Sequence, residues 1–306
     1  MAEKPSDTSD DQRLDKMFCH LTPHKAVVPY SIAFDEDKCL YVASKGGLFK
    51  VEKGGKEIMW SFPNEYPKKM SAYAQVSFHA NKIFHIQNED KTGLSEFKIY
   101  SLAGDLLHDS FIDGRVMSLA INGRGEMFMT KQAEEGQDEF FIFTTTVDKP
   151  TGWDELVVLD EKPFQALALY DDDTIIVATV TLPINMYSKE SLRWVDIKNK
   201  KLSAGFSSHG KEKGEIYFPR AIRRIGEDVL VLDKTGRFQT FDRNGKYIEL
   251  KAEVDAYLAN GFELIEDNQA LVVCSGIVYD ENKETVCDDW LEKITLNGST
   301  WKSERG

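Results

Sequence analysis

The sequence predicts an all-β protein, a six-bladed β-propeller whose blades are four-stranded antiparallel sheets. Two observations carry this prediction. An apolar column recurs six times at intervals of 40 to 55 residues, at Ile32, Val76, Leu119, Leu167, Ile222 and Phe262. A β-rich run begins seven to nine residues after each member, as in Leu40-Tyr41-Val42 and Val229-Leu230-Val231. Six units of about four strands each are typical of a propeller.

The later part of each unit supports the same alignment. An aromatic-rich strand at 96–100 runs to Gly104, and a second at 237–241 runs to Gly245 with the same offset. This turn needs a residue that tolerates positive φ, which glycine does best. Gly55, Asn199 and Gly298 hold the same place in units one, four and six. Unit three departs from the pattern around 144–153, so its outer strand is the least defined.

Composition indicates one soluble globular body. The chain has 306 residues, of which 42% are hydrophobic, so residues 15–306 can form one propeller with a large core. Residues 1–14 are acidic and almost free of apolar side chains, and we expect a disordered tail. No apolar run approaches the roughly twenty residues of a membrane span. The first residues lack the apolar region of a signal peptide, and the four cysteines follow no disulfide framework, so we expect a cytoplasmic or nuclear protein.

The ring is expected to close through an N-terminal strand. Residues 16–22 look like the outermost strand of a blade whose beginning is missing, and Pro23 lies nine residues before Ile32, just as Pro67 lies nine before Val76. Pairing this segment with the last blade would hide a free strand edge. The alternative is that residues 300–303 supply the same outer strand.

The units resemble NHL repeats, a family of six-bladed propellers. The fifth unit is most similar, with Phe218-Pro219, the run 229–233 and the run 237–245, and residues 29–35 with 40–43 of the first unit come next. The resemblance spans about residues 16–306 and is degenerate in the other four units. It implies a docking surface for RNA or for protein.

RNA binding is one alternative that the resemblance leaves open. It requires a positive field along the phosphate path, whereas the formal net charge is −13. The candidate basic residues are Lys25, Lys68, Lys69, Arg220, Arg223 and Arg224. We therefore rank RNA behind a protein or peptide ligand.

One pair of charges stands out in the repeat. Arg223 replaces the small residue of unit five, and Glu263 replaces it at the equivalent place of unit six. Because either charge alone would be costly to bury, we predict a structural ion pair. A charged patch beside the central channel is the functional alternative.

A hydrolase is the third reading. Propellers that resemble lactonases hold calcium over the channel with Glu, Asp and Asn from the starts of their inner strands, because hard cations prefer oxygen ligands. The equivalent ring here is Tyr30, Ala74, Met117, Gln165, Arg220 and Asn260. Only Asn260 suits a cation, so we expect neither a metal nor a cofactor. The sequence also shows no motif that would place a nucleophile beside a base. His85 lies between apolar residues and is interpreted as a packed core histidine.

Long connections between second and third strands indicate where a ligand would bind. They are 88–95, 132–139, 182–190 and 276–289, and all of them should emerge on the face that carries the ring. Apolar side chains within an acidic rim suit a protein or peptide ligand. The predicted partner-binding residues are Tyr30, Met117, Gln165, Met186, Tyr187, Arg220, Asn260 and Tyr279. The alternative is that these loops are long without a function.

Overall fold

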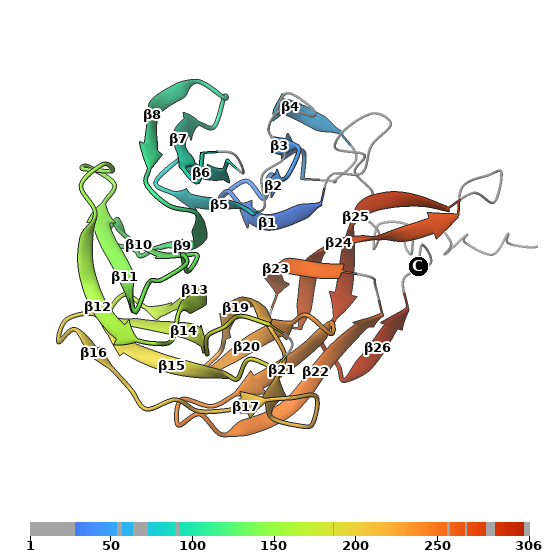
Figure 1. Ribbon diagram of the computed structural model, residues 1–306. Helices are drawn as coiled ribbons and strands as arrows, with labels where there is room; N and C mark the ends of the chain where they lie inside the picture. The colour runs from blue at the N-terminus through green and yellow to red at the C-terminus, as the bar shows by residue number, and fades with distance from the viewer. Residues whose placement is uncertain are drawn as a thin grey trace, which may run out of the picture.

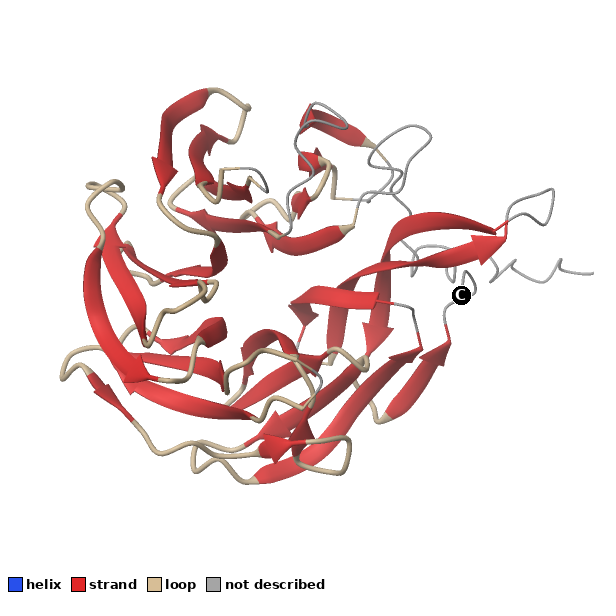
Figure 2. Ribbon diagram, in the orientation of Figure 1, coloured by secondary structure: helices blue, strands red, loops and turns tan. Residues whose placement is uncertain are grey.

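The computed structural model describes residues 28–53, 57–63, 73–89, 92–185, 187–255, 258–266, 268–279 and 285–302, of which 277–279 and 285–288 are described by their backbone. Six β-sheets surround a central channel, as Figure 1 shows by chain order and Figure 2 by secondary structure. The predicted six-bladed propeller is confirmed. Among these residues no helix is present that could cross a membrane.

Each blade runs from an inner strand at the channel to an outer strand at the rim, and consecutive strands pair antiparallel. Blades one to three consist of β1 (Pro29–Phe34), β2 (Leu40–Ser44), β3 (Gly47–Val51), β4 (Ile58–Pro63), β5 (Ala74–His79), β6 (Lys82–Asn88), β7 (Ser95–Ser101), β8 (Leu106–Ile112), β9 (Val116–Ile121), β10 (Glu126–Lys131), β11 (Glu139–Thr146) and β12 (Asp154–Asp160). The outer strand of unit three, which the sequence left least defined, is therefore β12.

Blades four to six follow the same plan. They consist of β13 (Phe164–Asp171), β14 (Thr174–Val180), β15 (Glu190–Asp196), β16 (Lys201–Leu202), β19 (Pro219–Ile225), β20 (Asp228–Asp233), β21 (Arg237–Phe241), β22 (Tyr247–Asp255), β23 (Leu258–Glu266), β24 (Gln269–Tyr279) and β25 (Thr285–Thr295). The connection between blades four and five contains a short parallel pair, β17 (Ser208–His209) and β18 (Glu215–Ile216). Blade six has three strands within the described residues.

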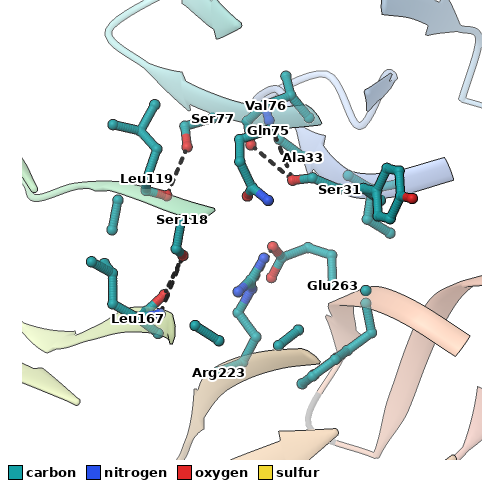
Figure 3. A pocket seen from close by; sticks show the side chains of 18 of the residues that line it. Ser31, Ala33, Gln75, Val76, Ser77, Ser118, Leu119, Leu167, Arg223 and Glu263 are labelled. Carbon is teal, nitrogen blue, oxygen red and sulfur yellow. Dashed lines mark hydrogen bonds and ion pairs between the residues drawn. The ribbon is translucent and has the colours of Figure 1, made fainter. Parts of the chain in front are cut away.

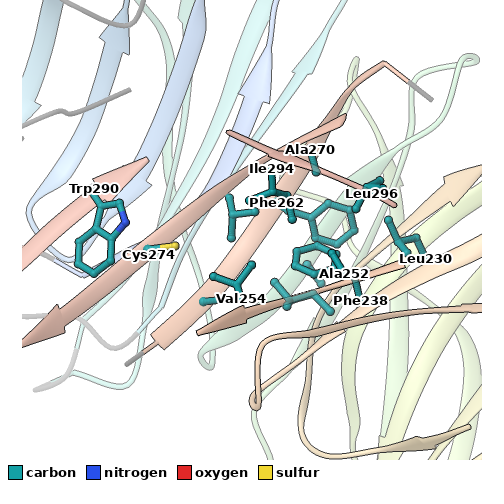
Figure 4. Packing of buried hydrophobic residues seen from close by; sticks show 14 residues of the cluster. Leu230, Phe238, Ala252, Val254, Phe262, Ala270, Cys274, Trp290, Ile294 and Leu296 are labelled. Atoms are coloured by element: carbon teal, nitrogen blue, oxygen red, sulfur yellow. The ribbon is translucent and has the colours of Figure 1, made fainter. Parts of the chain in front are cut away.

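Burial falls from the second strand of a blade to its rim. Every residue of β2 is buried, and so is all of β20 except its first residue, whereas five of the six residues of β4 are exposed. A strand that is buried on both faces has no polar face, which explains why the second strands read as continuous apolar runs. Neighbouring blades share the apolar clusters. In Figure 4 the Phe238 ring of β21 lies against Phe262 of β23, with ring centroids 5.0 Å apart.

Serine hydroxyls join neighbouring inner strands. Ser31 Oγ donates to Val76 O and accepts from Val76 N, both at 3.3 Å. Ser118 Oγ forms the same two bonds with Leu167, both at 3.2 Å. In each case the partner belongs to the apolar column that defines the repeat. A short hydroxyl side chain reaches both backbone groups of the next inner strand, so the close spacing of these strands favours small residues at these positions.

The junction between blade six and blade one is closer still. A Cβ atom at Gly261 of β23 would lie 2.4 Å from Tyr30 O of β1, and Asn260 Nδ2 donates to Pro29 O at 3.1 Å. Glycine at 261 is therefore required by the approach of a neighbouring backbone rather than by its own φ. An apolar cluster spans the same junction and comprises Ile32, Leu40, Val42, Phe49, Val51, Leu271, Val273 and Leu291.

The two chain ends bear on the predicted closure of the ring. The predicted N-terminal strand and the tail at 1–14 lie outside the described residues. The alternative, closure by the C-terminal residues, is wrong, because β26 (Ser299–Lys302) pairs in parallel with β22 of blade five. Gly298 (φ 83°) donates its N–H to Lys251 O and begins this path. Trp301 then packs against the apolar cluster of blades five and six, and its Nε1 donates to Thr295 O at 3.3 Å.

Two local expectations are corrected. The connection predicted at 276–289 is mostly an extension of the β24–β25 hairpin, in which Gly276 to Tyr279 pair with Asp288 to Thr285. The β-branched residues on both sides, such as Val278 and Val286, favour pairing over a loop. In blade four the positive φ falls on Lys200 (53°) instead of Asn199, whose side chain bonds Asp196.

Replacing Gly261 by Ala should open the junction between blades six and one. The added methyl group meets a backbone oxygen that cannot move without shifting β1, so we expect a loss of roughly 2 kcal/mol or more in unfolding free energy. The control is Gly152→Ala, where a Cβ would meet no atom within 4 Å. Equal denaturation midpoints for the two variants would show that β1 and β23 approach less closely.

His85 should contribute to acid sensitivity. Burial, followed by the charge of Lys98, lowers the pKa of His85 from 6.5 to about 4. As pH falls below about 6.5 the unfolded chain binds a proton that the folded chain takes up only near pH 4, so folding stability decreases across this window. His85→Gln should remove about 2 to 3 kcal/mol of that decrease in urea titrations between pH 7 and 4.5. An unchanged pH profile would contradict this origin.

Candidate functional site

The six inner strands enclose a channel of about 400 Å³. Its wall consists mainly of small or apolar side chains, and the hydroxyls of Ser31, Ser77 and Ser118 are bonded to the backbone of the next blade. Figure 3 shows these bonds, with Gln75, Arg223 and Glu263 directed toward the channel. The polar groups available to a ligand inside the channel are therefore few.

At one end of the channel the predicted ring residues come together. Five of the six, Tyr30, Met117, Gln165, Arg220 and Asn260, line a small cavity of about 50 Å³, which we call the mouth pocket. The face that carries it, where the inner strands begin, is called the mouth face.

A β-bulge explains why these residues face the channel. The pairing of each inner strand with the second strand shifts register at the ring position, between Pro29 and Ser31, Val116 and Ser118, Phe164 and Leu167, Pro219 and Ala221, and Ala259 and Gly261. A bulged residue is left out of the ladder and its side chain is re-aimed. The same defect in five blades thus presents five side chains at the mouth.

Blade two is the exception. Its inner strand pairs without a register shift, from Ala74 opposite Gln87 to His79 opposite Lys82, and Ala74 is buried. Tyr73 and Gln75 line the mouth pocket in its place. Tyr73 has a φ of 85°, which a bulky residue rarely adopts. The sequence column identified Ala74 and missed its two neighbours, because the repeat does not reveal which blade lacks the bulge.

Arg220 spans the mouth pocket. Its Nη1 donates to the Tyr73 hydroxyl at 3.4 Å, which connects blade five to blade two, and the Tyr73 ring lies 5.0 Å from that of Tyr30. Its Nε is buried and has no hydrogen-bond partner among the residues that the structure describes. By contrast, Asn260 is buried and uses its amide nitrogen to hold Pro29 O at the ring junction. Arg220 is thus the cationic group that lines the mouth pocket, and it has an unused donor at Nε.

Glu190 lies at the edge of the mouth pocket, a position that sequence reasoning missed. Its Oε2 accepts from Phe218 N at 2.6 Å and lies 3.3 Å from His209 Nδ1. Burial raises the pKa of Glu190, although the Phe218 N–H and His209 act in the opposite direction. The carboxylate therefore ties β15 to the chain that enters blade five.

Arg223 and Glu263 lie deeper in the channel. Arg223 Nε donates to Glu263 Oε2 at 2.8 Å, and the guanidinium also donates to Ile222 O at 2.7 Å. The two side chains are 29% and 26% exposed. They are thus paired beside the channel rather than buried between blades, so the ion pair and the charged patch weighed from the sequence coincide.

The connection from β14 to β15 is the best-defined loop of the mouth face. Thr181 Oγ1 accepts from Lys189 N at 2.8 Å, Ser188 Oγ donates to Pro183 O at 2.7 Å, and Asn185 Oδ1 accepts from Tyr187 N at 2.8 Å. Leu182, Ile184 and Tyr187 are nevertheless 41%, 42% and 81% exposed. The loop is fixed by its own hydrogen bonds while its apolar side chains face solvent.

The other two predicted partner-binding residues outside the ring are Met186 and Tyr279. Met186 lies outside the described residues. Tyr279 ends strand β24, so its predicted position on a loop is wrong. The extended hairpin places its backbone beyond the ring of blades, as Figure 1 shows.

The arginines proposed for RNA do not form a continuous strip. Arg220 is at the mouth, Arg223 is paired in the channel, and Arg224 lies at the opposite end of β19. There Arg224 contacts the Tyr170 ring at 4.5 Å and pairs with Glu227 at 3.0 Å. Lys25, Lys68 and Lys69 lie outside the described residues. In the same described part of the chain, no group of three or more His, Cys, Asp or Glu side chains could hold a metal ion.

Solved structures share the fold at low identity. No family model matches the chain. A gluconolactonase, XC5397 from Xanthomonas campestris, is 12% identical with a TM-score of 0.58, covering 91% of this chain and 89% of its own. The Dos1 propeller is 13% identical with a TM-score of 0.51, covering 90% and 69%, and the WD40 propeller domain of Doa1 is 11% identical with a TM-score of 0.51, covering 87% and 78%. These similarities establish a β-propeller.

A double-mutant cycle should measure the pair in the channel. Because Arg223 and Glu263 are partly exposed, we expect Arg223→Ala and Glu263→Ala each to reduce the unfolding free energy by about 1 to 2 kcal/mol. The double variant should lose about 1 kcal/mol less than the sum of the two. Strict additivity in chemical denaturation would mean that the two side chains do not interact in solution.

Proposed function

We propose that this propeller is a non-enzymatic interaction module that docks a peptide segment of a partner protein on its mouth face. The observation that carries the proposal is the loop at 181–189, whose apolar side chains remain exposed although its backbone is pinned. Such a loop loses little conformational entropy on binding, and exposed apolar or aromatic anchors supply most interface energy. The surrounding acidic residues would act as a polar rim.

The residues at the mouth favour docking over hydrolysis. Of the residues that line the mouth pocket, Glu190 is the one carboxylate, and its Oε2 is held by Phe218 N, whereas a calcium-dependent hydrolase needs several oxygen ligands. A gluconolactonase nevertheless shares the fold. The hydroxyls of Ser31 and Ser118 donate to backbone carbonyl groups and not to a base that would activate them as nucleophiles.

We also propose that the six units are NHL repeats. The fifth unit supports this assignment, because its Asp233 and Arg237 form an ion pair at 2.6 Å. Arg237 also donates to carbonyl groups of the segment that leads into the blade, at Gly210, Lys211, Glu212 and Glu215. The pair thereby fixes the approach to the inner strand. The proposed compartment is the cytoplasm or the nucleus, where the free thiols of Cys39 and Cys274 would stay reduced.

The test is selection from a displayed library of random peptides on the immobilised full chain. The loop variant carries Leu182→Ser, Ile184→Ser and Tyr187→Ala, and we expect it to lose the peptides that the wild type enriches. Its melting temperature should stay near that of the wild type, since exposed substitutions change stability by about 0.5 kcal/mol or less.

The matched control is Leu106→Ser with Leu107→Ser on the outer strand β8, where the side chains are 52% and 53% exposed. This variant should enrich the same peptides as the wild type. Equal enrichment on the loop variant would place the site elsewhere. Absence of peptides, together with retention of a random RNA pool at physiological salt, would favour the RNA-binding alternative.

A further inference from the structure

Arg220 lines the mouth pocket and has no anionic partner among the described residues. Arg193 also has none, but it lies outside this pocket and donates to Ser203 O at 2.9 Å. Within the described part of the chain Arg220 forms one long hydrogen bond, to a neutral tyrosine, and its Nε is buried without an acceptor. No carboxylate of the described residues lies within ion-pair distance of it. Five other arginines each have such a partner, in the pairs Arg124–Asp173, Arg223–Glu263, Arg224–Glu227, Arg237–Asp233 and Arg243–Asp171. Partly burying a guanidinium without an anion costs free energy. The position of Arg220 at the mouth therefore points to an anion that comes from a ligand.

The neighbours of Arg220 are neutral hydrogen-bonding groups. The Tyr73 hydroxyl lies beside its Nη1, and Gln75 and Gln165 line the same pocket, with side-chain amides that bond no described residue. The volume of about 50 Å³ is less than twice the roughly 30 Å³ that one water occupies in the liquid, so the pocket admits one small group. A planar carboxylate matches this size, and it matches the fork of a guanidinium.

Glu190 is the acidic side chain that lines this pocket, and it does not satisfy Arg220. Its Oε2 is held by Phe218 N and faces His209. Burial raises its pKa, which weakens its opposition to a second carboxylate. Glu190 also follows directly on the loop at 181–189, so the chain leads from the exposed apolar side chains to the mouth pocket.

We propose that the mouth pocket receives one acidic side chain, Asp or Glu, of the docked peptide, with Arg220 as its cationic partner. The inference rests on the proposed function, because the peptide carries the carboxylate. A single monovalent group is favoured over a phosphate or a polyanion, since the protein carries a formal net charge of −13 and the pocket admits one small group.

The first experiment uses the peptides enriched on the wild type. Each is synthesised with its Asp and Glu residues and again with Asn and Gln, and binding is measured by fluorescence anisotropy. Replacing the critical acid, or making Arg220→Met, should each weaken binding at least about tenfold, and the two changes together should cost little more than either. Tyr73→Phe should weaken binding less, and Arg124→Met on the opposite face should have no effect.

Several outcomes overturn the inference. Full affinity of the amide peptides, or of Arg220→Met for the acidic ones, would leave the docking surface in place and remove the carboxylate pocket. A melting temperature of Arg220→Met close to that of the wild type ensures that any loss is local. If that variant is unstable, the affinity of Tyr73→Phe for the acidic peptides is the test. An affinity equal to that of the wild type would then overturn the carboxylate pocket.

A second measurement separates this inference from the proposed function. The wild type is titrated with acetate, and with inorganic phosphate at equal ionic strength, while the ¹⁵N resonance of Arg220 Nε is followed. A saturable shift with acetate that phosphate does not reproduce supports the pocket even when no peptide is enriched. If no peptide is enriched, absence of a saturable acetate shift overturns it, and stronger binding of phosphate overturns the carboxylate preference in either case.

Discussion

The narrow ring of inner strands is the constraint on which the rest of this structure depends. Neighbouring inner strands lie so close that Ser31 and Ser118 bond both backbone groups of the next apolar-column residue. At Gly261 even a methyl group would not fit. Larger side chains can occupy the ring only where they extend into the channel, as Arg223 and Glu263 do, and there they compensate each other's charge. Small residues thus follow from geometry rather than from function.

A repeated defect of the strands separates the core from the recognition surface. The apolar column packs between blades, whereas the bulge two residues earlier turns Tyr30, Met117 and Arg220 toward the channel. Residues at the bulge can therefore vary without disturbing the core. Blade two shows the converse, because regular pairing buries Ala74 and leaves the mouth to Tyr73 and Gln75. Asymmetry of the mouth pocket arises from this one missing bulge.

Charge and exposure are distributed unevenly over the molecule. The protein is acidic as a whole, yet the mouth pocket contains an arginine that has no anionic partner in the described part of the chain. On the same face, the loop at 181–189 leaves the side chains of Leu182, Ile184 and Tyr187 exposed. Its backbone remains ordered because side-chain hydrogen bonds hold it. An apolar anchor surface on the same face as a single cation would suit the peptide with one acidic residue that we propose as the ligand.

The sequence alone determined the six-bladed architecture and most of the mouth ring, because both follow from local periodicity: the apolar column marks each inner strand, and a fixed offset from it marks the bulge. Tertiary structure decided what periodicity cannot encode. Strand register placed Tyr73 and Gln75 at the mouth instead of Ala74, and long-range pairing sent β26 to blade five. Contacts between distant segments brought Glu190 to the mouth pocket and left Arg220 without a carboxylate partner among the described residues. Such contacts depend on where blades meet in space, which no single repeat unit specifies.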